Sequence, residues 1–466
     1  MPRLLRVLST SVVLVAAACQ PDPGQLPSLD ALRQPSGLAV SPTGPVLFVT
    51  NGNWDRQQED GTLMAVDLDA LFMALADPAD AGDGGRPCRR VSADDPTIEC
   101  NPSAFIDAQT TVRLGTGAAN IAIDRPGGPE GPLRLLMPTR SPVSVTWVDV
   151  LPGEDGVTLD CGQDDAGRCG VTHEITRSAN ARMPNELSRI SVDTNGARFA
   201  YAPQVLGEAL ALIALDGDNG PELADVEGGF FRAAPFEEEE LFGGFSVAVR
   251  PCDPERAPDT SVDCSRPVAY AAHRYFPGMR QLTVAEGLDL ILPGEEIALQ
   301  TINPQVVEGR PYMGDMAFED DTGDRLLVVQ TTPPGLLRVD TSVDDDGDLA
   351  NTIIGAIPLC DNPNVLAVHR PVPPVGDEDA TPGESLALVT CATDGRLSVI
   401  GLGSFRVLAS IPVGEGAYEV VVDDQRAQAY VSNPGENTIS IVSLDPTSPD
   451  RFVEWARLGL GAGTRE

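Results

Sequence analysis

The sequence of 466 residues contains no lysine, so arginine supplies all 32 of its basic residues. This absence excludes a P-loop lysine, a Schiff-base lysine and a serine–lysine pair. The arginines are outnumbered by 69 aspartates and glutamates, which give a net charge of −37. Nucleic-acid binding needs a basic surface that displaces counterions from phosphates. The composition therefore argues against nucleic acid as a partner.

Local catalytic motifs are missing as well. The sequence has no HExxH, no GxSxG, no CxxCH haem site and no dinucleotide-binding GxGxxG context. It also lacks CxxC and has only three histidines, which makes a zinc site a poor interpretation of its cysteines. An active site assembled from distant segments leaves no local motif, so these absences do not exclude an enzyme.

The N-terminus has the pattern of an export signal. A short basic region is followed by an apolar run over 7–18, which is too short to span a membrane as a mature helix. The sequence AAAC at 16–19 resembles the bacterial lipobox, which implies that Cys19 becomes the first mature residue and carries a lipid. Gln20 is not the aspartate that usually retains lipoproteins in the inner membrane, so we expect anchoring in the outer membrane, on its periplasmic or cell-surface side. The alternative is an ordinary signal peptide and a soluble secreted protein.

The nine cysteines fit an exported protein. Eight remain when Cys19 is set aside, and eight cysteines allow 105 pairings. They fall into neighbouring couples along the chain, which favours local disulfides. The expected pairs are Cys88/Cys100, Cys161/Cys169, Cys252/Cys264 and Cys360/Cys391.

After a proline-containing tether at 19–34, a unit of four short apolar strands recurs seven times over 35–466. Its first strand is expected at Gly37–Val40, Asn120–Ile123, Arg189–Val192, Ser246–Val249, Asp315–Phe318, Val365–Val368 and Glu419–Val422. The fourth strand is expected at Thr110–Leu114, Ile297–Ile302, Thr352–Ile357, Arg406–Val413 and Phe452–Leu458, and is poor in the third unit, where Glu237–Glu240 interrupt it. The pattern predicts an all-β, seven-bladed β-propeller of four-stranded antiparallel blades.

Long insertions separate some of these strands, and 69–104 holds the first of them, with a possible helical turn at Leu71–Ala76. An alternative has eight blades, with a degenerate unit hidden in this insertion. The first and last units each have their own inner and outer strands, so closure of the ring is expected to depend on packing between them.

One hairpin carries a family resemblance. Residues 429–445 read AYVSNPGENTISIVSLD, which is two alternating apolar runs around an Asn-Pro-Gly-Glu-Asn turn. This segment resembles the repeat of YVTN-type β-propellers, a superfamily that includes lactonase-like members. The resemblance is specific over 414–445 and only periodic elsewhere.

Propeller topology places the loops between second and third strands, and those between blades, on one face. Polar residues at the ends of second strands are expected to surround the central channel there, as a site that takes a ligand. They are Arg140, Gln204, His273, Arg274, Gln330 and Asn433. The alternative is that they cap turns and strand ends. His173 and His369 lie in or beside insertions and are expected at the surface.

An acidic run suggests a calcium site, because hard cations prefer clustered carboxylates. Its candidate ligands are Asp344, Asp346 and Asp348. An EF-hand starting at Asp344 would need glycine at position six and glutamate at twelve, where Leu349 and Gly355 stand. A solvated acidic turn is the preferred interpretation and a looser calcium site the alternative; no other cofactor is expected.

The favoured function is a non-catalytic scaffold that binds an envelope protein or a small ligand through the face with His273 and Arg140. The alternative is a sugar lactonase in which these two residues polarise the ester carbonyl. Whether the protein is an enzyme is open at this level, with binding alone preferred.

Overall fold

A computed structural model describes residues 25–80, 85–92, 95, 97–128, 130–153, 156–193, 198–232, 242–251, 268–285, 287–299, 312–344, 348–372 and 383–459. The expected signal peptide at 1–18, Cys19 with its expected lipid, and Glu237–Glu240 lie outside these ranges. No helix in the described part of the chain has the length and hydropathy needed to cross a membrane.

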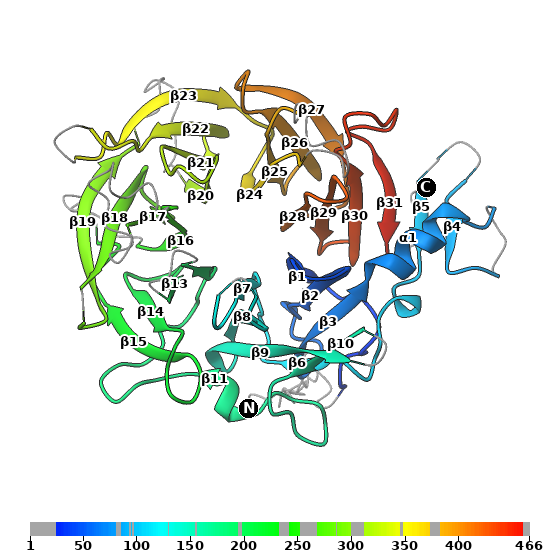
Figure 1. Cartoon of the computed structure of the whole chain (residues 1–466), viewed down its shortest axis with the longest axis horizontal. Helices are drawn as coiled ribbons and strands as arrows, with labels where there is room; N and C mark the ends of the chain where they lie inside the picture. The colour runs from blue at the N-terminus through cyan, green and yellow to red at the C-terminus, as the bar shows by residue number, and fades with distance from the viewer. Residues whose placement is uncertain are drawn as a thin grey trace, which may run out of the picture.

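Seven sheets stand side by side in a ring, each with its first strand nearest the centre (Figure 1). Blade 1 contains β1 (Pro35–Val40), β2 (Val46–Asn51), β3 (Gly61–Asp67) and β6 (Val112–Leu114). Blade 2 contains β7 (Ala122–Asp124), β8 (Leu133–Arg140), β9 (Val143–Gly153) and β10 (Gly156–Asp160), with the short β11 (Glu174–Ile175) also paired to β9. Blade 3 contains β12 (Ser191–Val192), β13 (Phe199–Pro203), β14 (Leu210–Ala214) and β15 (Glu222–Glu227).

The remaining blades follow the same order. Blade 4 contains β16 (Gly244–Val249), β17 (Ala269–His273), β18 (Gly278–Ala285) and β19 (Leu290–Ala298). Blade 5 contains β20 (Tyr312–Phe318), β21 (Arg325–Thr332), β22 (Gly335–Asp340) and β23 (Thr352–Pro358). Blade 6 contains β24 (Pro363–His369), β25 (Leu386–Cys391), β26 (Arg396–Gly401) and β27 (Arg406–Pro412). Blade 7 contains β28 (Val420–Asp423), β29 (Gln428–Asn433), β30 (Thr438–Ser443) and β31 (Glu454–Leu458).

The core consists of apolar clusters, each shared by two neighbouring blades. Side chains alternate between the two faces of a strand, and both faces of a blade are covered by a neighbour. In β29, for example, Tyr430 packs toward blade 1, whereas Ala429 and Val431 pack toward blade 6. This two-sided burial explains why the central strands are almost continuously apolar.

The seven-bladed fold predicted from the sequence is confirmed, with corrections to its outer strands. In blade 3 the fourth strand is β15, although no clear apolar pattern marked it in the sequence. The fourth strand of blade 4 was expected at Ile297–Ile302, but β19 begins earlier, at Leu290. Outer strands contact only one neighbouring strand and are partly exposed, so their apolar pattern is weak.

The insertion at 69–104 is not an eighth blade. It contains α1 (Leu68–Ala76), which Asp67 caps, the strands β4 (Cys88–Arg90) and β5 (Ile98–Cys100), and the 3₁₀ turn η1 (Pro102–Ala104). β5 pairs in parallel with β31, so the β4–β5 hairpin extends blade 7 outward (Figure 1). The expectation that closure depends on packing alone was therefore wrong, because a segment of blade 1 hydrogen-bonds to blade 7.

Three of the four expected disulfides are present in the described residues: Cys88–Cys100, Cys161–Cys169 and Cys360–Cys391. Cys88–Cys100 joins β4 to β5, and Cys161–Cys169 closes the loop that follows β10. Cys391 ends β25 and Cys360 precedes β24, so the third bond links two neighbouring strand ends on the face of the blade-to-blade loops. This agreement supports the strand assignment.

The fourth expected disulfide is not among those that the structure describes. Cys252 lies outside the described residues. Cys264 also lies outside the described residues, so the structure does not test whether Cys264 pairs with Cys252. This pair stays a prediction from the spacing of the two cysteines, and peptide mapping without reduction would test it.

Candidate functional site

A buried ion triad crosses the centre of the ring. Arg189, just before β12, donates from Nη1 and Nη2 to the two carboxylate oxygens of Glu419, just before β28, at 2.8 Å each. Its Nη2 also lies 3.4 Å from Asp315 Oδ2 on β20. The three side chains are exposed by 9%, 4% and 8%. The triad thus joins blades 3, 5 and 7 across the axis.

Burial acts strongly on this triad. It raises the pKa of Glu419, although Arg189 opposes the shift, because a carboxylate loses its hydration in the interior. For Arg189, burial lowers the pKa, but attraction to Asp315 and Glu419 outweighs it and the net pKa is raised. One arginine between two carboxyl groups keeps them in place at the centre of the ring.

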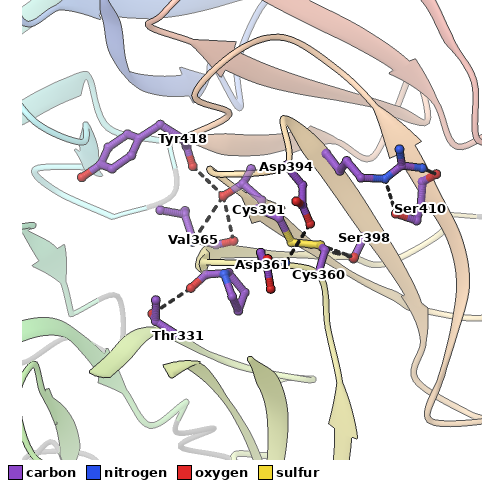
Figure 2. Close-up of a disulfide and its surroundings, with 12 residues drawn as sticks. Thr331, Cys360, Asp361, Val365, Cys391, Asp394, Ser398, Ser410 and Tyr418 are labelled. Carbon is purple, nitrogen blue, oxygen red and sulfur yellow. Dashed lines mark hydrogen bonds between the residues drawn. A yellow bond between two sulfur atoms is a disulfide. The ribbon is translucent and has the colours of Figure 1, made fainter. Parts of the chain in front are cut away.

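Tyr418 directly precedes Glu419 of the triad and lies toward the face of the blade-to-blade loops. Its backbone N–H donates to Ser432 O at 2.9 Å, and its carbonyl accepts from Thr390 Oγ1 at 2.7 Å. Figure 2 shows its ring extending away from blade 6. Burial raises the pKa of this phenol, while Arg189, Arg140 and Arg274 act to lower it. Tyr418 therefore remains a hydrogen-bond donor at neutral pH, with arginines of three blades around it.

Arg274, directly after β17, is a partly buried cation. Its Nη1 donates to Met313 O at 2.8 Å and lies 3.4 Å from Asn364 Oδ1. Its Cζ lies 4.7 Å from the ring centroid of Phe245 and 5.8 Å from that of Tyr312. Among the described residues no carboxylate pairs with it, and burial lowers its pKa. A buried charge without a counterion is costly, so this position favours an anionic ligand.

Arg140, the last residue of β8, brings a second guanidinium to the same face. Its Nη1 lies 3.1 Å from Glu186 Oε2, and its Cζ lies 4.5 Å from the ring centroid of Trp54. Gly117, at φ +69°, leaves room for this side chain, because a Cβ there would lie 2.9 Å from Arg140 Cβ. Glu186 has an unusual positive φ of +53°, so its position is set by the backbone conformation of its loop.

We define the channel mouth as Arg140, Arg274, Tyr418, Glu186 and Trp54, above the triad of Arg189, Asp315 and Glu419. Two of the residues expected from the sequence, Arg140 and Arg274, lie there. Both act electrostatically on Tyr418. What the mouth offers chemically is positive charge, a phenol donor, a carboxylate and aromatic faces.

Three further predicted residues serve the blades themselves. Asn433 is fully buried; its Oδ1 accepts from Gly414 N, and its Nδ2 donates to Thr438 and Ser440 at 3.1 and 2.9 Å. Gln204 Nε2 donates to Asn185 Oδ1 at 2.5 Å, and Gln330 is buried with its Nε2 3.5 Å from Thr332 O. These contacts match the alternative that such residues cap strand ends.

The histidines differ from expectation. His273 is 2% exposed; its ring packs edge-on against Phe231 and Phe276, and its Nε2 lies 2.7 Å from Glu296 on the outer strand. We therefore leave it out of the channel mouth. His369 was expected at the surface, but it is 1% exposed, and its Nδ1 lies 2.6 Å from Asp424 Oδ1. His369 is the last residue of the inner strand β24, and its side chain turns toward Asp424 of blade 7. It is therefore buried between two blades, which explains the error.

His173, in the 3₁₀ turn η2 (Val171–His173), is half-buried, with its ring centroid 3.8 Å from that of Trp147. Burial lowers its pKa. It packs on blade 2, away from the channel mouth.

The acidic turn is described in part. Asp348 N donates to Asp344 Oδ1 at 2.9 Å, and Asp346 lies outside the described residues. Among the residues that the structure describes, no three histidine, cysteine, aspartate or glutamate side chains are grouped so as to hold a metal ion. The solvated turn and the alternative of a looser calcium site both stay untested.

A groove of about 710 Å³ lies between blades 1 and 2 on the opposite face. Two of its carboxylates already have structural roles, since Asp67 caps α1 and Asp69 pairs with Arg426 at 2.7 Å. We therefore do not assign a ligand to it.

The triad and Tyr418 were not predicted from the sequence. A signal was available, because Arg189, Asp315 and Glu419 each begin a predicted inner strand and so occupy equivalent places in their blades. Opposite charges at equivalent inner positions of a ring indicate contact across its axis.

The fold and the channel mouth define a seven-bladed propeller with a polar site at one end of its axis.

Comparison with known proteins supports the fold and nothing beyond it. No protein-family model matches the chain, and no curated protein matches it. Among solved structures, the hydrazine synthase of Kuenenia stuttgartiensis is similar over 88% of this chain and 96% of its own, with 14% identity and a TM-score of 0.50. The periplasmic gluconolactonase PpgL of Pseudomonas aeruginosa is similar over 83% and 87%, with 14% identity and a TM-score of 0.48. A putative 6-phosphogluconolactonase of Bacteroides fragilis is similar over 82% and 85%, with 15% identity and a TM-score of 0.47.

Proposed function

We propose that the channel mouth binds a small organic anion and hydrolyses the corresponding lactone. The observation that carries this proposal is Arg274, a partly buried guanidinium that no described carboxylate neutralises. A ligand carboxylate would supply the missing charge and accept charge-assisted hydrogen bonds. The rings of Phe245 and Tyr312 hold the guanidinium in place for this role.

Lactone opening suits the same residues. As water adds to the ester carbonyl, negative charge develops on the carbonyl oxygen, and guanidinium and phenol donors stabilise that charge. Arg274 and Tyr418 take this role in the proposal. Glu186 accepts the proton of the attacking water; the ring C–O bond then breaks, and the leaving oxygen takes up a proton to give a hydroxy acid. The product is itself an organic anion.

The substrate class follows from the YVTN-type resemblance at 414–445, which points to lactonase-like propellers. A sugar lactone has several hydroxyl groups besides its ester, and these suit the carboxylate and the aromatic faces of the channel mouth. We therefore choose δ-gluconolactone as the first substrate to test and gluconate as the first anion.

Two measurements test the proposal. Calorimetric titration with gluconate should show binding to the wild type, weakened roughly 10- to 100-fold in Arg274→Gln, the amount one charge-assisted hydrogen bond contributes. Arg406→Gln, which alters an exposed arginine on an outer strand, is the matched control and should bind normally.

Hydrolysis is tested separately with Glu186→Gln. We expect kcat for δ-gluconolactone to fall about 100-fold or more, as for loss of a general base, while gluconate binding changes little. Binding without turnover by the wild type would exclude the hydrolase and leave the non-catalytic scaffold, whose partner in-cell crosslinking would identify.

The location of the protein belongs to the same proposal. An outer-membrane lipid anchor on Cys19 predicts incorporation of labelled fatty acid into the wild type and none into Cys19→Ala. Label in both proteins would exclude Cys19 as the attachment site.

A further inference from the structure

The Cys360–Cys391 disulfide differs from the other described disulfides in accessibility. Cys88, Cys100, Cys161, Cys169 and Cys391 are all buried, with exposures of 0%, 0%, 0%, 5% and 0%. Cys360 is half-buried, and Asp361 beside it is exposed. Solvent therefore reaches the Cys360 residue of this bond, whereas both cysteines of each of the other two described bonds are buried.

The same disulfide joins two segments that hold the channel mouth (Figure 2). On one side, Thr390 precedes Cys391 and donates from Oγ1 to the carbonyl of Tyr418 at 2.7 Å. On the other side, Cys360 begins the short segment 360–364, whose Asn364 Oδ1 lies 3.4 Å from Arg274 Nη1. Each half of the bond is thus within a few residues of a contact to Tyr418 or Arg274.

Segment 360–364 leads into β24, where Pro363 pairs with Cys391, and it makes further polar contacts. Asp361 N donates to Asp394 Oδ2 at 2.8 Å, Ala392 N donates to Asn362 O at 3.1 Å, and Thr331 Oγ1 donates to Pro363 O at 2.7 Å. Pro363 and Asn364 are buried in β24, so the disulfide chiefly restrains the exposed residues Asp361 and Asn362 before the strand, which polar contacts alone hold otherwise.

We propose that Cys360–Cys391 is a thiol-sensitive clasp that regulates the channel mouth, an inference that rests on the proposed function for its effect on ligand. A dithiol reductant attacks Cys360 Sγ, the S–S bond breaks, and Cys391 leaves as a thiolate that takes up a proton. The second thiol of the reductant then displaces Cys360 as a thiol and leaves the reductant as its disulfide. The residues before β24 are then released, and the contacts of Asn364 and Tyr418 at the channel mouth loosen.

The first test needs no ligand. Folded wild-type protein is treated with limiting dithiothreitol, alkylated and mapped by mass spectrometry, and hydrogen exchange is followed over 362–366 and 417–420. We expect Cys360 and Cys391 to be alkylated before Cys88, Cys100, Cys161 and Cys169, and exchange to rise in both segments. Simultaneous or later reduction of this bond, or unchanged exchange after its reduction, would overturn the clasp.

The second test measures ligand. Cys360→Ser/Cys391→Ser should bind gluconate roughly tenfold more weakly than the wild type, a loss of the size expected when a ligand-contacting group is misplaced. Cys161→Ser/Cys169→Ser, which removes the disulfide of the loop after β10 in blade 2, should bind like the wild type. Equal weakening in both variants would mean a general loss of stability and overturn the inference. If the oxidised wild type binds no gluconate, the proposed function fails, and the clasp is judged by the exchange result alone.

Discussion

Arg274 shows how a residue can serve binding at the expense of stability. Burial lowers its pKa, and no described carboxylate offsets its charge. Replacing a buried, uncompensated charge by an apolar side chain of similar length removes this cost. We predict that Arg274→Met raises the free energy of unfolding by about 1 kcal/mol, measured by urea denaturation, and abolishes gluconate binding. A less stable variant would show that Arg274 is a structural residue.

The opposite result is expected for Arg189. Arg189→Met leaves Asp315 and Glu419 buried without a counterion, which should cost about 3–5 kcal/mol at neutral pH. Arg325→Met, at a side chain that is 56% exposed, is the control.

The pH dependence of this loss has a definite sign. Burial already raises the pKa of Glu419, and removing Arg189 raises it further. An acid whose pKa is higher in the folded than in the unfolded state binds more protons when folded, so stability falls as pH rises between the two values. The destabilisation by Arg189→Met should therefore be smallest in acid and grow toward pH 7. Urea midpoints across that range would contradict this if the loss grew on acidification.

For the residues of the channel mouth, the sequence predicted the face of the ring on which they lie but not the direction of each side chain. The ends of second strands do meet on one side of the ring, as Arg140 and Arg274 show. Neighbouring residues, however, point to opposite sides of a strand, so His273 enters the blade while Arg274 reaches the mouth. The sequence does not show which way each side chain points at the end of a strand. His273 was therefore expected at the channel mouth together with Arg274, although of these two only Arg274 lies there.

At the scale of elements, central strands were predictable and the closing hairpin was not. Two-sided burial makes central strands apolar and regular, as in β21 and β25. β4 and β5 have three residues each, and β5 pairs with β31, a strand more than 350 positions away, so no local pattern marks them. Their pairing depends on the finished ring.

This hairpin leads to a prediction at the same scale. Ile98 on β5 is 7% exposed within the cluster shared by blades 1 and 7. We expect Ile98→Ala to lower the free energy of unfolding by about 2–4 kcal/mol through lost burial and a cavity. Val91→Ala, at a residue 40% exposed, should change it by no more than about 0.5 kcal/mol. An unchanged urea midpoint for Ile98→Ala would mean that the hairpin does not close the ring.

For the whole molecule, the ring separates two faces with different roles. Ion pairs on one face join neighbouring blades, as Arg198 joins blade 3 to Asp124 of blade 2 at 2.5 Å. The other face carries the channel mouth, and the triad beneath it ties three blades across the axis. The fold could be predicted from seven repeats of one strand pattern. The site could not, because its residues come from several blades.

The most direct measurement is calorimetric titration of the oxidised wild-type protein and of Arg274→Gln with gluconate, with Arg406→Gln alongside. Binding at the channel mouth predicts saturable binding to the wild type and to Arg406→Gln, and binding weakened roughly 10- to 100-fold in Arg274→Gln. Absence of binding to the wild type, or equal affinity in all three proteins, would contradict an anion site at Arg274.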